Sequence, residues 1–104
     1  MLIFQKQYFV SPFENSNTNN EEINMSKKDD AWNNANEIKG QNPDVWRQDA
    51  YGNKIRYGSY GTQGDYGWEI DHKHPVSKGG TDSPRNLQAL YWEENRQKGN
   101  KYPY

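Results

Sequence analysis

The 104-residue chain contains no cysteine, few aliphatic residues and no long hydrophobic run. The absence of cysteine excludes disulfide frameworks, thiolate zinc sites and cysteine nucleophiles, and it leaves the redox compartment undecided. No stretch approaches the roughly 18 apolar residues needed to cross a bilayer, so we expect no transmembrane segment and no membrane partner. Hydrophobic residues make up only 31% of the chain, which predicts one domain with a small core.

Aromatic residues are abundant where aliphatic ones are scarce. The chain has 4 Trp, 8 Tyr and 3 Phe, and each can bury a large area while keeping its polar edge wet. We therefore expect aromatic packing to stabilise the domain, with Trp46, Trp68 and Trp92 in the core. The net charge of −1 hides an asymmetry, because residues 1–38 are acidic and residues 39–104 are basic. A polyanionic partner should bind the second half.

The first 29 residues are predicted to form a flexible segment that precedes a folded domain over residues 30–104. From Glu14 to Asp30 the sequence has only Ile23 and Met25 to bury, so this stretch cannot offset the entropy of ordering its backbone. Its apolar start is interrupted at residues 5–7, which argues against a signal peptide. A further hypothesis is that translation starts at Met25.

The middle of the chain predicts a short helix and a hairpin. Asp29 or Asp30 can cap a helix whose apolar residues recur on one face as far as Ile38. Residues 45–48 and 54–57 flank a turn-rich stretch and predict a β-hairpin. A helix beginning near Asn42, with proline at its first position, is the alternative.

The last third of the chain predicts the order strand, loop, strand, helix. After an irregular glycine-rich loop over residues 58–67, residues 68–72 and 86–90 have strand character and are separated by a long turn. Residues 91–98 predict a helix, because acidic residues lie near its start.

The segment 67–99 resembles the HNH endonuclease family in the order and spacing of its motifs. These are Asp71-His72, Pro75, Gly79-Gly80, Asn86-Leu87-Gln88, Asn95 and Lys98. The likeness is to a cysteine-free branch, since many members carry two CxxC pairs that bind a structural zinc. The resemblance implies an α+β domain of ββα-metal type, in which two antiparallel strands and a helix hold one divalent cation.

The chemistry of phosphodiester hydrolysis gives these residues distinct roles. At neutral pH an unperturbed histidine is mostly the free base, so His72 is the candidate general base. Asp71 and Asn95 offer hard oxygen ligands that suit Mg²⁺, or Mn²⁺ in its place. The resemblance gives Asn86 the role of holding the loop and orienting the imidazole. His74 is a further metal or phosphate candidate, although the motif does not require histidine there, and Glu69 is either an outer carboxylate or a solvated strand charge.

Basic side chains cluster around the same residues, where they can contact the DNA backbone. The predicted contacts are Lys73, Lys78, Arg85, Arg96 and Lys98. A solvated basic face is the plainer interpretation. Glycines 79 and 80 can bind phosphate through backbone N–H groups, but a tight turn explains them equally well.

The resemblance implies a hydrolase: a metal-dependent endonuclease that acts on DNA, with double-stranded DNA as the expected partner. The expected setting is the cytoplasm of a bacterial or phage-infected cell, in defence, packaging or a mobile element. A toxin delivered into another cell is an alternative, and an immunity or targeting protein is then a second partner. Two other functions stay open: a non-catalytic nucleic-acid-binding module of the same fold, and an RNase-type toxin domain.

Overall fold

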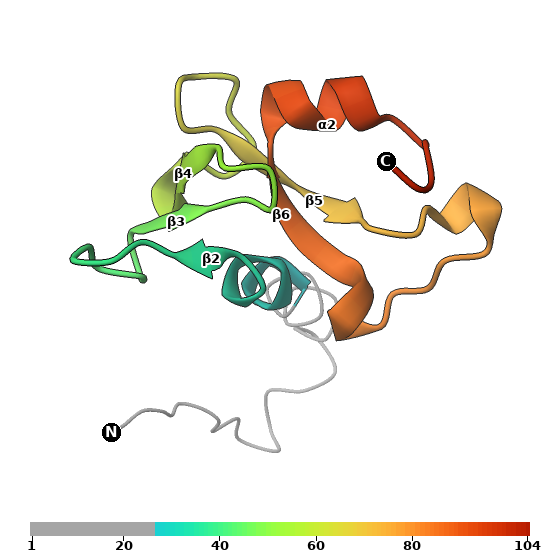
Figure 1. Cartoon of the computed structure of the whole chain (residues 1–104), viewed down its shortest axis with the longest axis horizontal. Coiled ribbons are helices and arrows are strands. Elements are labelled where there is room, and N and C mark those ends of the chain that lie inside the picture. The colour runs from blue at the N-terminus through green and yellow to red at the C-terminus, as the bar shows by residue number, and fades with distance from the viewer. Residues whose placement is uncertain (1–26) are drawn as a thin grey trace, which may run out of the picture.

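Two antiparallel sheets organise residues 27–104, the part of the chain that the computed structural model describes (Figure 1). The first sheet has the strand order β2, β3, β4 and the second pairs β5 with β6. The bounds are Asn36–Glu37 for β2, Trp46–Gln48 for β3, Lys54–Arg56 for β4, Trp68–His72 for β5, Leu87–Tyr91 for β6 and Trp92–Lys98 for helix α2. The predicted α+β class is confirmed. The predictions of flexibility and of a start at Met25 concern residues that lie outside the described part.

The N-terminal helix ends earlier than predicted. Residues 27–33 are helical, and the extension to Ile38 is wrong because Asn36 and Glu37 pair with β3 instead. The side chain of Asn34 donates to the carbonyl oxygens of Pro84 at 2.9 Å and Leu87 at 2.8 Å. An asparagine whose amide reaches other backbone groups competes with helix continuation. Residues 27–29, which we placed in the N-terminal segment, belong to this helix.

The predicted hairpin is confirmed. Strands β3 and β4 pair in register from Trp46 opposite Arg56, whereas the alternative helix at Asn42 is only a turn. The hairpin is tied to the second sheet by Asp49, which is 1% exposed. Its carboxylate accepts hydrogen bonds from backbone N–H groups of its own turn and from Tyr91 N at 3.0 Å. A buried carboxylate with these partners is well satisfied, so it anchors the hairpin.

The core lies between the N-terminal helix, β4 and one face of the β5–β6 sheet. Its buried residues are Ala31, Trp32, Ile55, Trp68, Leu87 and Ala89. The rings of Trp32 and Trp68 lie 5.3 Å apart, which confirms aromatic packing and the core position of Trp68. Trp46 and Trp92 are only half-buried, so their predicted core positions are wrong. Trp46 packs edge to face against Tyr66 instead.

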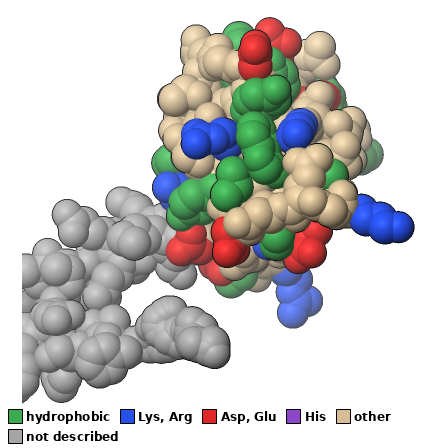
Figure 2. All heavy atoms as spheres, turned by 90° about the vertical axis from the view of Figure 1, so that its left-hand side faces the viewer, with side chains coloured by type: hydrophobic (Ala, Val, Ile, Leu, Met, Phe, Trp, Pro, Cys, Tyr) green, Lys and Arg blue, Asp and Glu red, His purple; other side chains and the backbone are tan. Residues whose placement is uncertain are grey.

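Hydrophobic side chains also reach the surface. Figure 2 shows a stripe of them between Lys and Arg side chains on the face that lies at the left of Figure 1. No helix within residues 27–104 has the length and apolar character to span a bilayer.

The predicted order of strand, loop, strand and helix is confirmed for the last third of the chain. Strand β5 pairs with β6 over five residues, with Asp71 opposite Gln88 and His72 opposite Leu87. Helix α2 follows β6 directly and contacts both strands. It ends at Gly99, whose φ of 51° suits glycine. This arrangement brings the sequence motifs of β5 and α2 together.

Candidate active site

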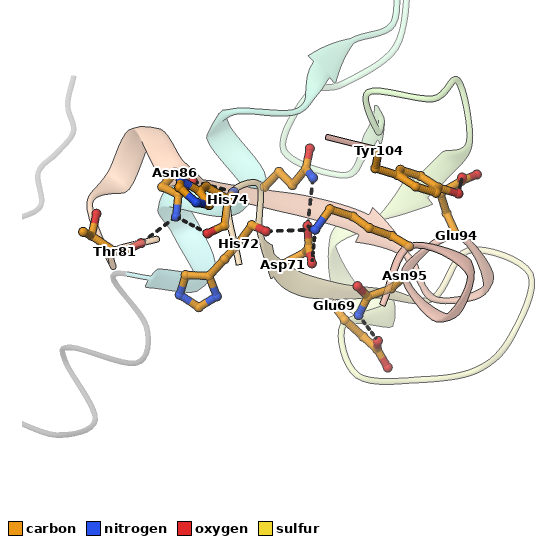
Figure 3. A network of polar contacts seen from close by, with 11 residues as sticks. Glu69, Asp71, His72, His74, Thr81, Asn86, Glu94, Asn95 and Tyr104 are labelled. Atoms are coloured by element: carbon orange, nitrogen blue, oxygen red, sulfur yellow. Dashed lines mark hydrogen bonds and ion pairs between the residues drawn. The ribbon is translucent and has the colours of Figure 1, made fainter. Parts of the chain in front are cut away.

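Alternation along β5 sends its side chains to two faces of the sheet. Trp68 and Ile70 face the core, whereas Glu69 and Asp71 contact side chains of α2. His72 ends the strand, and Figure 3 shows its imidazole pointing away from the Asp71 carboxylate. The candidate residues therefore form three separate groups of contacts.

The first group is a buried ion pair between Asp71 and Lys98. The Lys98 Nζ lies 3.2 Å from Asp71 Oδ2 and 3.0 Å from the His72 carbonyl oxygen. The Gln88 side chain donates to the same carboxylate at 2.9 Å. Lys98 is only 1% exposed and Asp71 8%. A buried charge is tolerated only when it is paired in this way.

The second group lies one helical turn away on α2 and also faces β5. Asn95 Nδ2 donates to Glu69 Oε1 at 2.6 Å, and Arg96 binds both oxygens of the same carboxylate at 2.7 and 3.0 Å. The Arg96 hydrogen bond holds the pKa of Glu69 below its usual value, with a smaller contribution from Asn95, while burial opposes both. Asp71 and Asn95 thus both lie at the interface between β5 and α2, but they do not contact each other.

The third group surrounds the imidazole of His72. Its Nε2 lies 2.7 Å from Asp82 Oδ1, and the other oxygen of Asp82 lies 3.1 Å from Lys27 Nζ. Asp82 belongs to the loop between β5 and β6, and Lys27 to the N-terminal helix. His72 is half-buried, so its ring is both held and accessible.

The Asn86 side chain links two parts of the loop between β5 and β6 by hydrogen bonds (Figure 3). Its Nδ2 donates to Thr81 O at 2.7 Å and to His74 O at 3.0 Å, and its Oδ1 accepts from His74 N at 2.9 Å. A Cβ at Gly80 would lie 1.7 Å from His74 O, so the backbone approach in this loop requires glycine. These contacts match the loop-holding role and the tight-turn interpretation.

The ring of His74 is occupied by the fold around it. Its Nε2 donates to the Lys78 carbonyl oxygen at 2.7 Å, and its plane stacks on Tyr102 with ring centroids 4.2 Å apart. Nothing in these contacts faces Asp71 or His72. The His74 ring therefore contacts the loop and Tyr102 and lies apart from the contacts of Asp71 and His72.

The predicted backbone-contacting cations divide into two sets. Lys73, Lys78 and Arg85 are exposed and form no ion pair with any residue in the range 27–104. Arg96 is exposed but paired with Glu69, and Lys98 is buried against Asp71. A cavity of about 350 Å³ beside the loop is lined by Arg85, together with His74, Gly79, Gly80, Thr81, Ser83 and Asn86.

The donor set at the β5–α2 interface suits a hard divalent cation. The carboxylates of Asp71 and Glu69 and the amide oxygen of Asn95 are the kind of oxygen ligand that Mg²⁺ and Mn²⁺ prefer. The described residues contain no group of three His, Cys, Asp or Glu side chains placed to hold a metal ion. A cation here would thus need water and phosphate as further ligands, and it would compete with the Lys98 ammonium for Asp71.

The sequence analysis assigned no contact to Gln88 or Asp82, and it placed Lys98 at the DNA backbone rather than in a buried ion pair. Gln88 lies opposite Asp71, which the antiparallel pairing of the two predicted strands could have indicated. Asp82 sits in an irregular loop, where no periodicity places a side chain. The burial of Lys98 had one available signal, its position one turn beyond Asn95 on the predicted helix.

Comparison with known proteins agrees with this geometry. The family model described as HNH endonuclease matches residues 57–101, a range that includes β5, the loop, β6 and α2. No curated protein and no solved structure matches the chain.

Proposed function

We propose that the protein is a metal-dependent endonuclease that hydrolyses DNA phosphodiester bonds, because residues 57–101 match the family model described as HNH endonuclease. HNH domains act on nucleic acids, and the family consists generally of endonucleases. The observation that carries the proposal is the placement of the motif residues. An accessible imidazole ends β5, the strand that also carries Asp71, and both Asp71 and Asn95 lie at the interface between β5 and α2.

His72 acts as the general base in this proposal. Hydrolysis requires removal of a proton from the attacking water, and a half-buried imidazole at a strand end can accept it. Asn86 supports this role indirectly, because it fixes the loop against which the imidazole rests. Its loss should disturb alignment rather than cation binding.

Asp71 and Asn95 would hold the cation, with Mg²⁺ as the preferred ion and Mn²⁺ as a substitute. When bound there, the ion supplies Lewis-acid neutralisation of charge on the phosphate and on the leaving oxygen. Glu69 keeps Arg96 and Asn95 in place from the strand side. Lys98 neutralises Asp71 in the conformation described here.

Asn95→Ala should weaken the cation dependence of cleavage more than DNA affinity. Removal of one of two protein ligands is expected to raise the half-saturating Mg²⁺ concentration roughly tenfold or more. A Mg²⁺ titration of initial rates measures this, with the dissociation constant for DNA measured in parallel. An unchanged half-saturation point would remove Asn95 from the proposed ligand set.

Lys78→Ala and Arg85→Ala should weaken DNA binding uniformly across sequences. Both side chains are exposed and unpaired among residues 27–104, and each phosphate contact contributes roughly one unit to the dependence of log K on log salt. Binding measured from 50 to 200 mM salt should give a shallower slope for each variant. A defect confined to particular sequences would contradict a backbone contact.

Little intrinsic sequence specificity is expected, because phosphate contacts carry no sequence information directly. The resemblance implies 5′-phosphate and 3′-hydroxyl ends as products. A targeting or immunity protein belongs to the same proposal as a possible second partner.

The proposal is tested by incubating plasmid, linear duplex and RNA with the protein in Mg²⁺, Mn²⁺ or EDTA. DNA cleavage that requires a divalent cation and produces 5′-phosphate ends is the expected result. DNA binding with no cleavage in any metal would favour the non-catalytic module, and preferential RNA cleavage would favour the RNase alternative.

A further inference from the structure

We propose that Asp82 is the positioning residue of His72: its carboxylate accepts the Nε2–H and leaves Nδ1 as the nitrogen that takes the proton from water. This inference rests on the proposed function of His72 as general base.

The contact with Asp82 indicates which nitrogen of a neutral His72 imidazole carries the proton. His72 Nε2 and Asp82 Oδ1 are 2.7 Å apart, and the hydrogen bond from His72 keeps the pKa of Asp82 below its usual value, with Lys27 adding to the effect. An ionised carboxylate has no proton to donate, so Nε2 must be the donor. In a neutral imidazole the other nitrogen is then an acceptor. No hydrogen bond to Nδ1 occurs among residues 27–104.

Three contacts fix the position of Asp82, one to its own side chain and two to the residues beside it. Its second oxygen pairs with Lys27 at 3.1 Å. The residue before it, Thr81, accepts a hydrogen bond from the Asn86 side chain at 2.7 Å, and the residue after it, Ser83, accepts one from the Asn86 backbone N–H at 2.8 Å. Asn86 therefore acts on the imidazole through Asp82, without touching the ring.

The carboxylate also fits the proton balance of the reaction. Water gives a proton to Nδ1 while its oxygen attacks phosphorus, the bond from phosphorus to the leaving oxygen breaks, and that oxygen takes a proton from solvent. The imidazole then carries protons on both nitrogens, and its Nε2–H bond to Asp82 becomes charge-assisted and stronger. Asp82 thus stabilises the charge that forms on His72, as the aspartate of a Ser-His-Asp triad does.

The test compares Asp82→Ala and Asp82→Glu with a matched control, Asp44→Asn, which changes an exposed aspartate on the turn before β3. Asp82→Ala should lower kcat roughly 10- to 100-fold with little change in KM. Asp82→Glu should recover part of the loss, and Asp44→Asn should match wild type.

A spectroscopic readout separates positioning from mere loop stability. In ¹H–¹⁵N spectra of histidine-labelled protein at pH 8, wild-type His72 should show the pattern of a single Nε2–H tautomer. In Asp82→Ala the two ring nitrogen shifts should move toward each other as the tautomers mix. An unchanged His72 pattern in Asp82→Ala overturns the proposal, whatever happens to kcat.

Failure of the proposed function gives a different result. If His72→Ala cleaved DNA as fast as wild type, His72 would not be the base, and no catalytic consequence of Asp82 would remain. The nitrogen shifts would still decide whether Asp82 sets the tautomer, so the two failures are distinguishable.

Discussion

Replacing His72 with alanine should lower the rate of DNA cleavage roughly 10²- to 10⁴-fold, the range that a positioned general base contributes. The side chain is half-buried at the end of β5, and its one polar contact within residues 27–104 is to Asp82, so its removal should leave the fold and DNA affinity close to wild type. Single-turnover cleavage at saturating Mg²⁺ measures the effect, with the dissociation constant and Tm as checks on binding and folding.

His74→Ala provides the comparison for this result. The two histidines are two residues apart, but the His74 ring is bonded to the Lys78 carbonyl and stacked on Tyr102. Its replacement should lower Tm more and the cleavage rate less than replacement of His72. A rate loss at His74 as large as that at His72 would contradict the assignment of a single base.

Replacing Lys98 with methionine should destabilise the domain by about 3–5 kcal/mol, because it leaves the buried Asp71 carboxylate without a counter-charge. Methionine keeps most of the volume of the side chain, so the loss reports the charge. Urea unfolding without divalent cations measures it. A loss below about 1 kcal/mol, the value of an exposed pair, would mean that the pair is open to solvent.

The double variant Asp71→Asn, Lys98→Met is the control for this prediction. It removes both charges and should recover much of the stability that Lys98→Met loses, since a buried pair can often be replaced at little cost. Mg²⁺ should stabilise Lys98→Met more than wild type, because the cation no longer competes with an ammonium for Asp71. Mg²⁺ should not give this extra stabilisation to the double variant, which lacks the Asp71 carboxylate.

The sequence was sufficient to predict the part of the fold that carries the site. The strand character of residues 68–72 and 86–90 and the acidic start of residues 91–98 predicted two strands and a helix, the resemblance to the HNH family implied the same elements, and they form in the expected order. The helix at residues 27–33 was predicted too long, since the side chain of Asn34 donates hydrogen bonds to residues 50 and 53 positions away. Local propensity has no information about such contacts.

The buried side-chain contacts of the site and of the hairpin could not be predicted from the sequence. A lysine on a helix is usually solvated, and the burial of Lys98 follows only from the packing of α2 against β5. Likewise, the anchoring of the hairpin by Asp49 depends on the backbone N–H of Tyr91 on a distant strand.

Anomalous diffraction can show whether one divalent cation binds between β5 and α2. Crystals of His72→Ala bound to a DNA duplex in Mn²⁺ would trap the substrate uncut. We expect one manganese peak within bonding distance of an Asp71 carboxylate oxygen, the Asn95 amide oxygen and a DNA phosphate, with Lys98 displaced from Asp71. A peak elsewhere, or none while Lys98 still pairs with Asp71, would contradict this expectation.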